Sequence, residues 1–72
     1  MVNQIKKSIK ISGHKTSVAL EKEFWFQLNK ISHDRQLKVS QIIEKIDKQK
    51  RNGSLASKIR VYILKILIKN QN

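Results

Sequence analysis

The sequence predicts a small, mainly helical domain in which one short basic strand precedes three helices. Two observations predict this fold class. Apolar residues alternate with polar ones over residues 15–20 and then recur at helical spacing in three later segments. The chain has 72 residues without cysteine, which fits one domain with no disulfides. We expect this domain over residues 8–69, between a basic N-terminal arm at 1–7 and a tail at 70–72.

The strand pattern changes phase at Gly13. Isoleucines occupy odd positions before this glycine, whereas Val18 and Leu20 occupy even positions after it. Because a shift of one residue moves every side chain to the other face of a strand, we expect a bulge or tight turn at Gly13. Residues 8–12 could fold back there, but the simplest partner for the strand is the same strand of a second copy.

Three later segments carry apolar residues at helical spacing and predict helices over residues 22–34, 39–50 and 55–69. The last helix follows Ser54, a residue type that caps helix starts, and has more apolar surface than one surface helix needs. A chain this small also has a marginal core, so we expect a homodimer. The residues predicted to form the dimer core are Val18, Leu20, Trp25, Leu28, Ile42, Ile43, Ile46, Ile59, Tyr62 and Ile63.

The charge balance is strongly basic. The chain has sixteen lysines and arginines and five aspartates and glutamates, which gives a formal net charge of +11. Such a field attracts polyanions, either nucleic acid or an anionic membrane surface. No leader segment is visible, and no apolar run approaches the roughly 18 residues of a membrane span. We therefore expect a cytoplasmic protein associated with the nucleoid.

The residues that carry metal and catalytic chemistry are sparse. His14 and His33 are too few and too far apart for a metal set, so no metal and no cofactor are expected. Ser17, His33 and Asp34 do not form a catalytic set, because adjacent helix residues point in different directions and no glycine-rich nucleophile turn is present. We expect no enzyme activity.

A longer stretch resembles a known family. "KTSVALEKEFWFQLNKISHDRQLKVSQIIEKI" resembles the ribbon-helix-helix family of dimeric DNA-binding proteins, to which the Arc and methionine repressors belong. "GHKTSVALEKEFW" together with "IDKQKRNGSLASKIR" is similar to a bacterial branch with a Gly-His-x-Thr-Ser strand and a third helix. The resemblance covers about residues 7–67. It implies a dimeric transcriptional regulator that inserts an antiparallel ribbon into the major groove of double-stranded DNA.

The resemblance also assigns base-contacting residues. In the family, the outward side chains of the strand face the bases, and the matching positions here are Lys15, Ser17 and Ala19. A lysine can donate to guanine, and a serine hydroxyl can donate or accept. Ala19 offers only a methyl contact where many members have a polar reader.

Phosphate contacts follow from the start of the second helix, where the family uses main-chain N–H groups. Val39 and Ser40 supply these groups here, after Lys38 in place of the usual serine or threonine cap. The cap hydrogen bond is lost, but a cation stands beside the expected phosphate. His14 either contacts DNA or hydrogen-bonds across the Gly13 bend. The other predicted phosphate contacts are the lysines of the N-terminal region, Lys6, Lys7 and Lys10.

Other functions remain open. The chain could be an antitoxin-type DNA-binding protein whose third helix docks a protein partner, or an architectural DNA binder with little sequence preference. The third helix is also basic and amphipathic, which is typical of membrane-surface proteins. Arg60 in that helix is either a partner of Asp47 or Glu44 at the dimer interface or a solvated charge.

Overall fold

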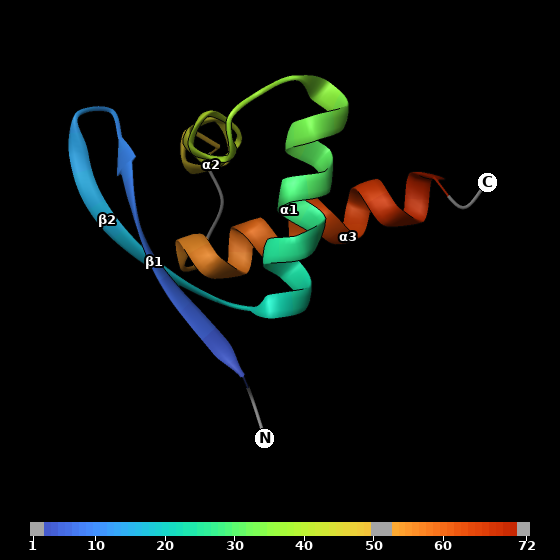
Figure 1. Ribbon diagram of the computed structural model, residues 1–72, viewed down its shortest axis with the longest axis horizontal. Helices are drawn as coiled ribbons and strands as arrows, with labels where there is room; N and C mark the ends of the chain where they lie inside the picture. Colours follow the sequence, from blue (N-terminus) through green and yellow to red (C-terminus); the bar gives the residue numbers. More distant parts are fainter. Residues whose placement is uncertain (1–2, 50–52, 71–72) are drawn as a thin grey trace.

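The computed structural model describes residues 3–49 and 53–70, and it shows a two-stranded hairpin followed by three helices (Figure 1). This arrangement confirms the mainly helical fold class, including the third helix. The elements in chain order are β1 (Gln4–Ile11), β2 (His14–Glu21), α1 (Lys22–Arg35), α2 (Val39–Asp47) and α3 (Leu55–Asn70).

The tight turn expected at Gly13 is confirmed. β1 and β2 pair antiparallel and are joined by Ser12 and Gly13, whose φ angles are 50° and 82°. Positive φ at both central residues is typical of a type I′ turn, the two-residue turn whose twist matches that of a hairpin. Glycine adopts this conformation without a steric cost, which explains its place at the point where the apolar pattern changes phase.

The strand finds its partner inside the chain, so two expectations are corrected. Residues 4–7, predicted as part of a free arm, lie in β1 opposite residues 18–21 of β2. The indole Nε1–H of Trp25 donates to the carbonyl of Ile5 at 2.8 Å, and this bond ties β1 to α1. The lone strand that seemed to need a second copy is therefore half of a hairpin. Residues 1–2 of the expected arm lie outside the described part of the chain.

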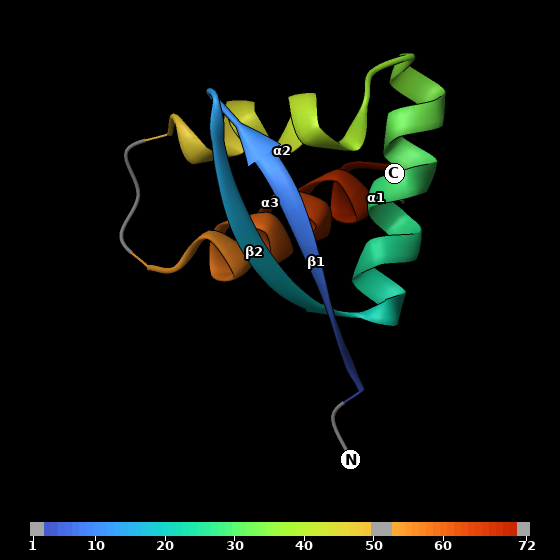
Figure 2. The same cartoon turned by 60° about the vertical axis from the view of Figure 1, so that its left-hand side comes forward.

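The hairpin has two distinct faces. Directly opposite residues share a face, so the odd positions of β1 lie with the even positions of β2. We call this side the inner face, and it carries Ile11, Val18 and Leu20, which are buried at 6%, 3% and 0% exposure. The inward phase predicted for Val18 and Leu20 is thereby confirmed. All three helices lie on this side of the hairpin (Figure 2).

The helix boundaries agree with the predictions except at the end of α2. That helix ends at Asp47, whereas the prediction ran to residue 50, which lies outside the described residues. The apolar spacing stops at Ile46, and the polar run that follows has no side chain to bury. At the start of α3 the Ser57 N–H donates to the Ser54 hydroxyl at 3.2 Å, which confirms the predicted cap. α3 continues through Asn70, the first residue of the predicted tail.

The core closes within one chain. Nine of the ten residues predicted for a dimer core are buried in a single protomer, and Tyr62 is half-buried against them. Helices α1, α2 and α3 contribute to this core together with the inner face of the hairpin. A role of these residues in a dimer interface stays a prediction, because their burial needs no second copy. The buried residues are Ile11, Val18, Leu20, Trp25, Leu28, Ile31, Ile42, Ile43, Ile46, Ile59 and Ile63.

Candidate nucleic-acid interface

The side of the hairpin that points away from the helices is polar and basic, and we call it the outer face. Its cross-strand pairs are Lys6 opposite Ala19, Ser8 opposite Ser17 and Lys10 opposite Lys15. All of these side chains are exposed except that of Ala19, which is half-buried. The view in Figure 2 shows that the helices leave this side of the hairpin open. The outer face is therefore a two-stranded ribbon surface on which another molecule can lie.

Between Lys6 and the turn, the charge on the outer face is concentrated and positive. Lys10 lies directly opposite Lys15, and like charges in opposite positions destabilise a strand pair. Lys6 adds a third ammonium on β1, and the nearest acid in register is Glu21 at the far end of the hairpin. A polyanion on this surface would relieve the repulsion between the lysines.

Two hydroxyls lie among the lysines. Ser8 and Ser17 face each other across the strands, between the Lys6 position and the pair formed by Lys10 and Lys15. A serine hydroxyl can donate or accept, so the two can read either a donor or an acceptor on a base edge. Ser8 was missed as a site residue by sequence reasoning, because its place on this face depends on the pairing of β1 with β2.

Glu21 is held away from the lysines by α3. The Arg60 guanidinium donates to its carboxylate from Nε at 3.0 Å and from Nη2 at 3.3 Å, and the Gln4 amide donates at 3.2 Å. The hydrogen bonds from Arg60, more than any other contact, hold the pKa of Glu21 below its ordinary value. Within the chain, Arg60 is thus paired with Glu21, and neither of the two alternatives considered from the sequence, a pair with Asp47 or Glu44 or a solvated charge, describes it. The pair neutralises the single acid at the edge of the basic surface.

The start of α2 offers the second predicted anion site. Lys38 precedes the helix with no side-chain cap, as expected, and the Gln41 side chain accepts from its N–H at 2.8 Å. Among the described residues, no backbone carbonyl outside the helix accepts from the N–H groups of Val39 and Ser40. These groups and the helix dipole favour an anion. Later in the same helix, the carboxylate of Glu44 accepts a hydrogen bond from the Ser12 hydroxyl in the hairpin turn at 3.1 Å.

Two predicted phosphate contacts lie on the other side of the hairpin. The ammonium of Lys7 sits 5.0 Å from the centroid of the Trp25 ring, on the inner face. His14 lies opposite Ile11 and borders a small pocket with Asp47. The strand alternation places both residues away from Lys15, so they are not part of the outer face.

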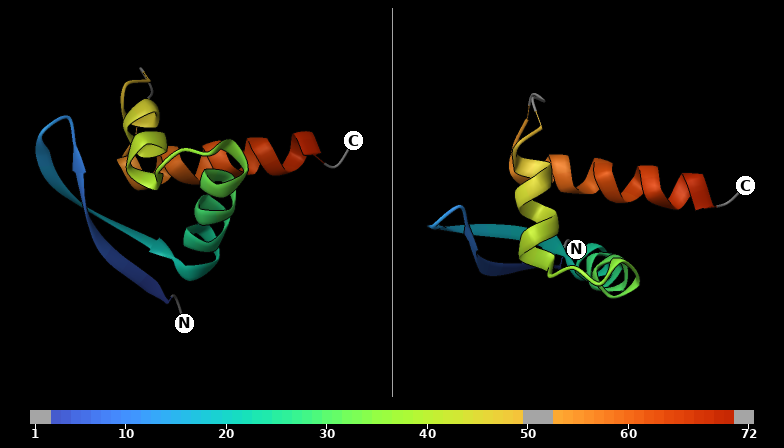
Figure 3. Two further views of the ribbon diagram at one scale, coloured as in Figure 1. Left: turned by 45° about the horizontal axis from the view of Figure 1, so that its top comes forward. Right: turned by 90° about the horizontal axis from the view of Figure 1, so that it is seen from above.

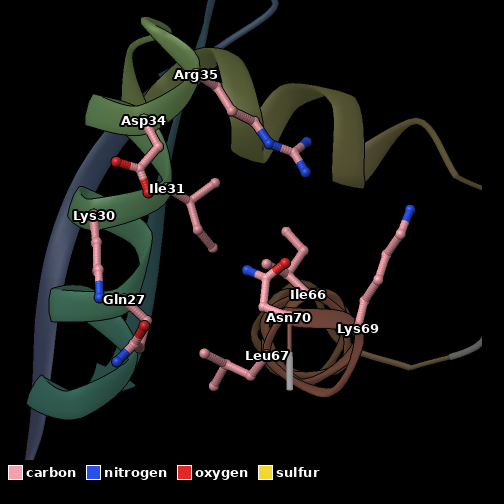
Figure 4. A pocket seen from close by; sticks show the side chains of 9 residues that line it. All are labelled: Gln27, Lys30, Ile31, Asp34, Arg35, Ile66, Leu67, Lys69 and Asn70. Atoms are coloured by element: carbon pink, nitrogen blue, oxygen red, sulfur yellow. The ribbon is translucent and has the colours of Figure 1, made fainter. Parts of the chain in front are cut away.

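A cleft lies between α1 and α3. Figure 4 shows Ile31 of α1 pointing toward Ile66 of α3, with Asp34 as the only acid among the labelled residues. The remaining lining residues are Gln27, Lys30, Arg35, Leu67, Lys69 and Asn70. Arg35 is also engaged outside the cleft, since its Nη1 donates to the Tyr62 hydroxyl at 3.0 Å.

Within residues 3–49 and 53–70, no group of three or more histidine, cysteine, aspartate or glutamate side chains could hold a metal ion. In this part of the chain no helix has both the length and the apolar character needed to cross a membrane.

The chain thus combines a basic two-stranded ribbon with three helices, and the N–H groups at the start of α2 favour an anion. Comparison with known families matches residues 4–67 to the Ribbon-helix-helix domain, so the chain belongs to the ribbon-helix-helix family. This is a non-enzymatic DNA-binding family of the transcription-regulator type, and its domains usually dimerise. Neither the search of curated proteins nor the search of solved structures found a match.

Proposed function

We propose that the protein is a dimeric transcriptional regulator that binds double-stranded DNA with the outer face of its hairpin in the major groove. The observation that carries this proposal is the pairing of Lys10 with Lys15 beside two facing serines on an open ribbon. The major groove, about 12 Å wide, admits a two-stranded ribbon, and its base edges carry a distinct pattern of donors and acceptors. The family assignment supports the same reading.

The proposal assigns different tasks to the outer face and to α2. Lys15 and Ser17 face base edges, and Ala19 is available for a methyl contact. Lys6 and Lys10 reach the phosphates beside the groove, while Lys38 and the N–H groups at the start of α2 bind a further phosphate. His14 and Lys7 are not included, because they lie on the inner face.

The homodimer is part of the proposal. A single chain already forms its own ribbon, so the ribbon itself does not require a second copy. Two other observations support the dimer: domains of this family usually dimerise, and the outer edges of a two-stranded hairpin tend to pair with another chain. Two copies would place two basic ribbons along one duplex. Sedimentation at micromolar concentration should show a dimer, and a folded monomer that still binds DNA with full affinity would remove this part of the proposal.

The test is a selection from random duplexes with the purified chain, followed by binding titrations at several salt concentrations. Enrichment of one shared sequence supports a regulator that reads bases. If each subunit engages three or four phosphates, log K against log[salt] should have a slope of roughly −5 to −7 per dimer. A flat salt response, or tighter binding to anionic vesicles than to duplex, would contradict the proposal.

Matched variants separate the two faces of the hairpin. Lys15→Ala should weaken binding to the selected duplex with little change in thermal stability, and Lys30→Ala on α1 removes the same charge as a control. If Lys15 reads a base, the preference at one operator position should fall by about 1–3 kcal/mol.

Val18→Ala, on the inner face, should instead lower the free energy of unfolding by about 1–3 kcal/mol, because it leaves a defect in the core. If Lys15→Ala unfolds the chain and Val18→Ala only weakens DNA binding, the assignment of the two faces of the hairpin is wrong.

A further inference from the structure

Helix α3 has a second apolar surface on the side that faces away from the core. Its core side carries Ile59 and Ile63, both fully buried. On the other side, Leu64 is 48% exposed and Ile68 is 63% exposed. Val61, half-buried, precedes them at the same helical spacing. We call Val61, Leu64 and Ile68 the apolar stripe.

The apolar stripe is open in the described part of the chain. The hairpin and α1 lie on the same side of α3, and the opposite side of its C-terminal half is left uncovered (Figure 3). The stripe residues recur at i, i+3 and i+7, the spacing of one coiled-coil seam. A helix that serves only as a lid on the core would carry polar residues at these positions.

One flank of the stripe is a line of positive charge. Lys58, Lys65 and Lys69 lie seven and four residues apart, so they fall on one side of α3. Lys65 is four residues after Val61 and three before Ile68, which places it beside the stripe. We call these three lysines the lysine row. The other flank carries Arg60, whose charge is bound to Glu21.

Charge decides which occupant fits the stripe. Over its length, Leu55–Asn70, α3 contains no aspartate or glutamate. A second α3 packed on the stripe would therefore meet the lysine row with cations of its own, and like charges along a helical seam oppose pairing. A helix that lies on a membrane buries a broad apolar face in it, whereas the outward side of α3 offers only the single narrow seam of the stripe.

We propose that the apolar stripe and the lysine row dock an acidic amphipathic helix of a partner protein. The partner would place apolar side chains on Leu64 and Ile68 and carboxylates along the lysine row, as in a helix-in-groove or coiled-coil contact. This inference adds a protein-binding surface to the proposed DNA-binding face. The two surfaces lie on different elements, so an experiment can disprove binding at one of them and leave binding at the other unaffected.

The experiment uses the full chain and a fluorescent peptide designed as an amphipathic helix, with leucine at the a and d positions of each heptad and glutamate at e and g. Fluorescence polarisation should show saturable binding to this peptide. A peptide with lysine in place of every glutamate should not bind. Leu64→Gln and Ile68→Gln should each weaken binding of the glutamate peptide about tenfold or more, since both remove an apolar anchor.

Charge reversal makes the test specific. The double variant Lys65→Glu and Lys69→Glu should lose the glutamate peptide and gain the lysine peptide. All of these residues are exposed, and a thermal melt verifies that each variant is folded. Lys15→Ala, on the outer face, should bind the peptide like the unmodified chain.

Three results would overturn the inference. The first is no binding of the glutamate peptide by the folded chain. The second is a dimer that becomes monomeric in Leu64→Gln, which would assign the stripe to a second copy. The third is binding to anionic vesicles that depends on Leu64 and exceeds binding to the peptide. DNA binding by the outer face is measured separately, so none of these results bears on it.

Discussion

Trp25 is the residue on which the placement of β1 depends. Its ring is buried, its Nε1–H donates to the Ile5 carbonyl, and the Lys7 ammonium lies over its face. The sequence predicted that Trp25 packs in a core, and its burial agrees. The bond to Ile5 could not be predicted, because it requires a strand that the sequence presented as a polar arm.

Trp25→Phe should keep most of the buried ring and lose the bond to Ile5. We expect a loss of about 1 kcal/mol in unfolding free energy, the typical contribution of one hydrogen bond, measured by denaturant titration. Hydrogen exchange should speed up more in β1 than in α2. Phe26→Leu, at a ring that is 65% exposed, is the control and should change little. Equal loss of protection in every element would show that Trp25 has no special role in holding β1.

Glu21 makes the stability of the fold depend on pH. Its hydrogen bonds to Arg60 and Gln4 lower the pKa of the folded carboxyl below the unfolded value. A depressed pKa contributes stability above the unfolded pKa, and this contribution is lost as pH falls through the folded pKa. Thermal melts should therefore lose midpoint temperature through this acidic window. Glu21→Gln should flatten that part of the pH profile, and an unchanged profile would show that the ion pair with Arg60 adds no stability.

At the scale of elements, the hairpin is what the sequence predicted least completely. The alternation after Gly13 identified β2 and its buried face, and the change of phase located the turn. β1 was seen only in part, because Lys6 and Lys7 interrupt its apolar pattern and Ile5 remains 42% exposed. The helices were predicted more completely, since each carries several apolar residues at helical spacing and must bury them. Only the end of α2 was misplaced, where no apolar residue marks the boundary.

The turn offers a clean test of the hairpin. Gly13 has φ of 82°, and a Cβ added there would meet no atom within 4 Å. Gly13→Ala should therefore cost about 1 kcal/mol through backbone conformation alone, with no clash. Ser12→Asn is the matched change, because asparagine tolerates positive φ, and it should keep or raise the thermal midpoint. A neutral Gly13→Ala would argue against a type I′ turn.

At the scale of the molecule, the family and the fold were within reach of the sequence, whereas the shape of the binding surface was not. Lys15 and Ser17 were predicted as outward residues from the strand alternation, and the register agrees. The positions of Ser8 and of the pair formed by Lys10 and Lys15 on this face depend on which strand pairs with β2. The sequence favoured the same strand of a second copy as that partner. Both strands of the outer face therefore come from one chain. The spacing of apolar residues in the sequence does not predict this pairing.

The central claim is that DNA lies on the outer face of the hairpin. NMR titration of the isotopically labelled chain with the duplex obtained by selection tests it most directly. The account predicts that resonances of Lys6, Ser8, Lys10, Lys15 and Ser17 shift in proportion to bound DNA, together with those at the start of α2. Resonances of the lysine row on α3 should stay in place. Shifts confined to the lysine row or to the cleft between α1 and α3, with the hairpin unchanged, would contradict the claim.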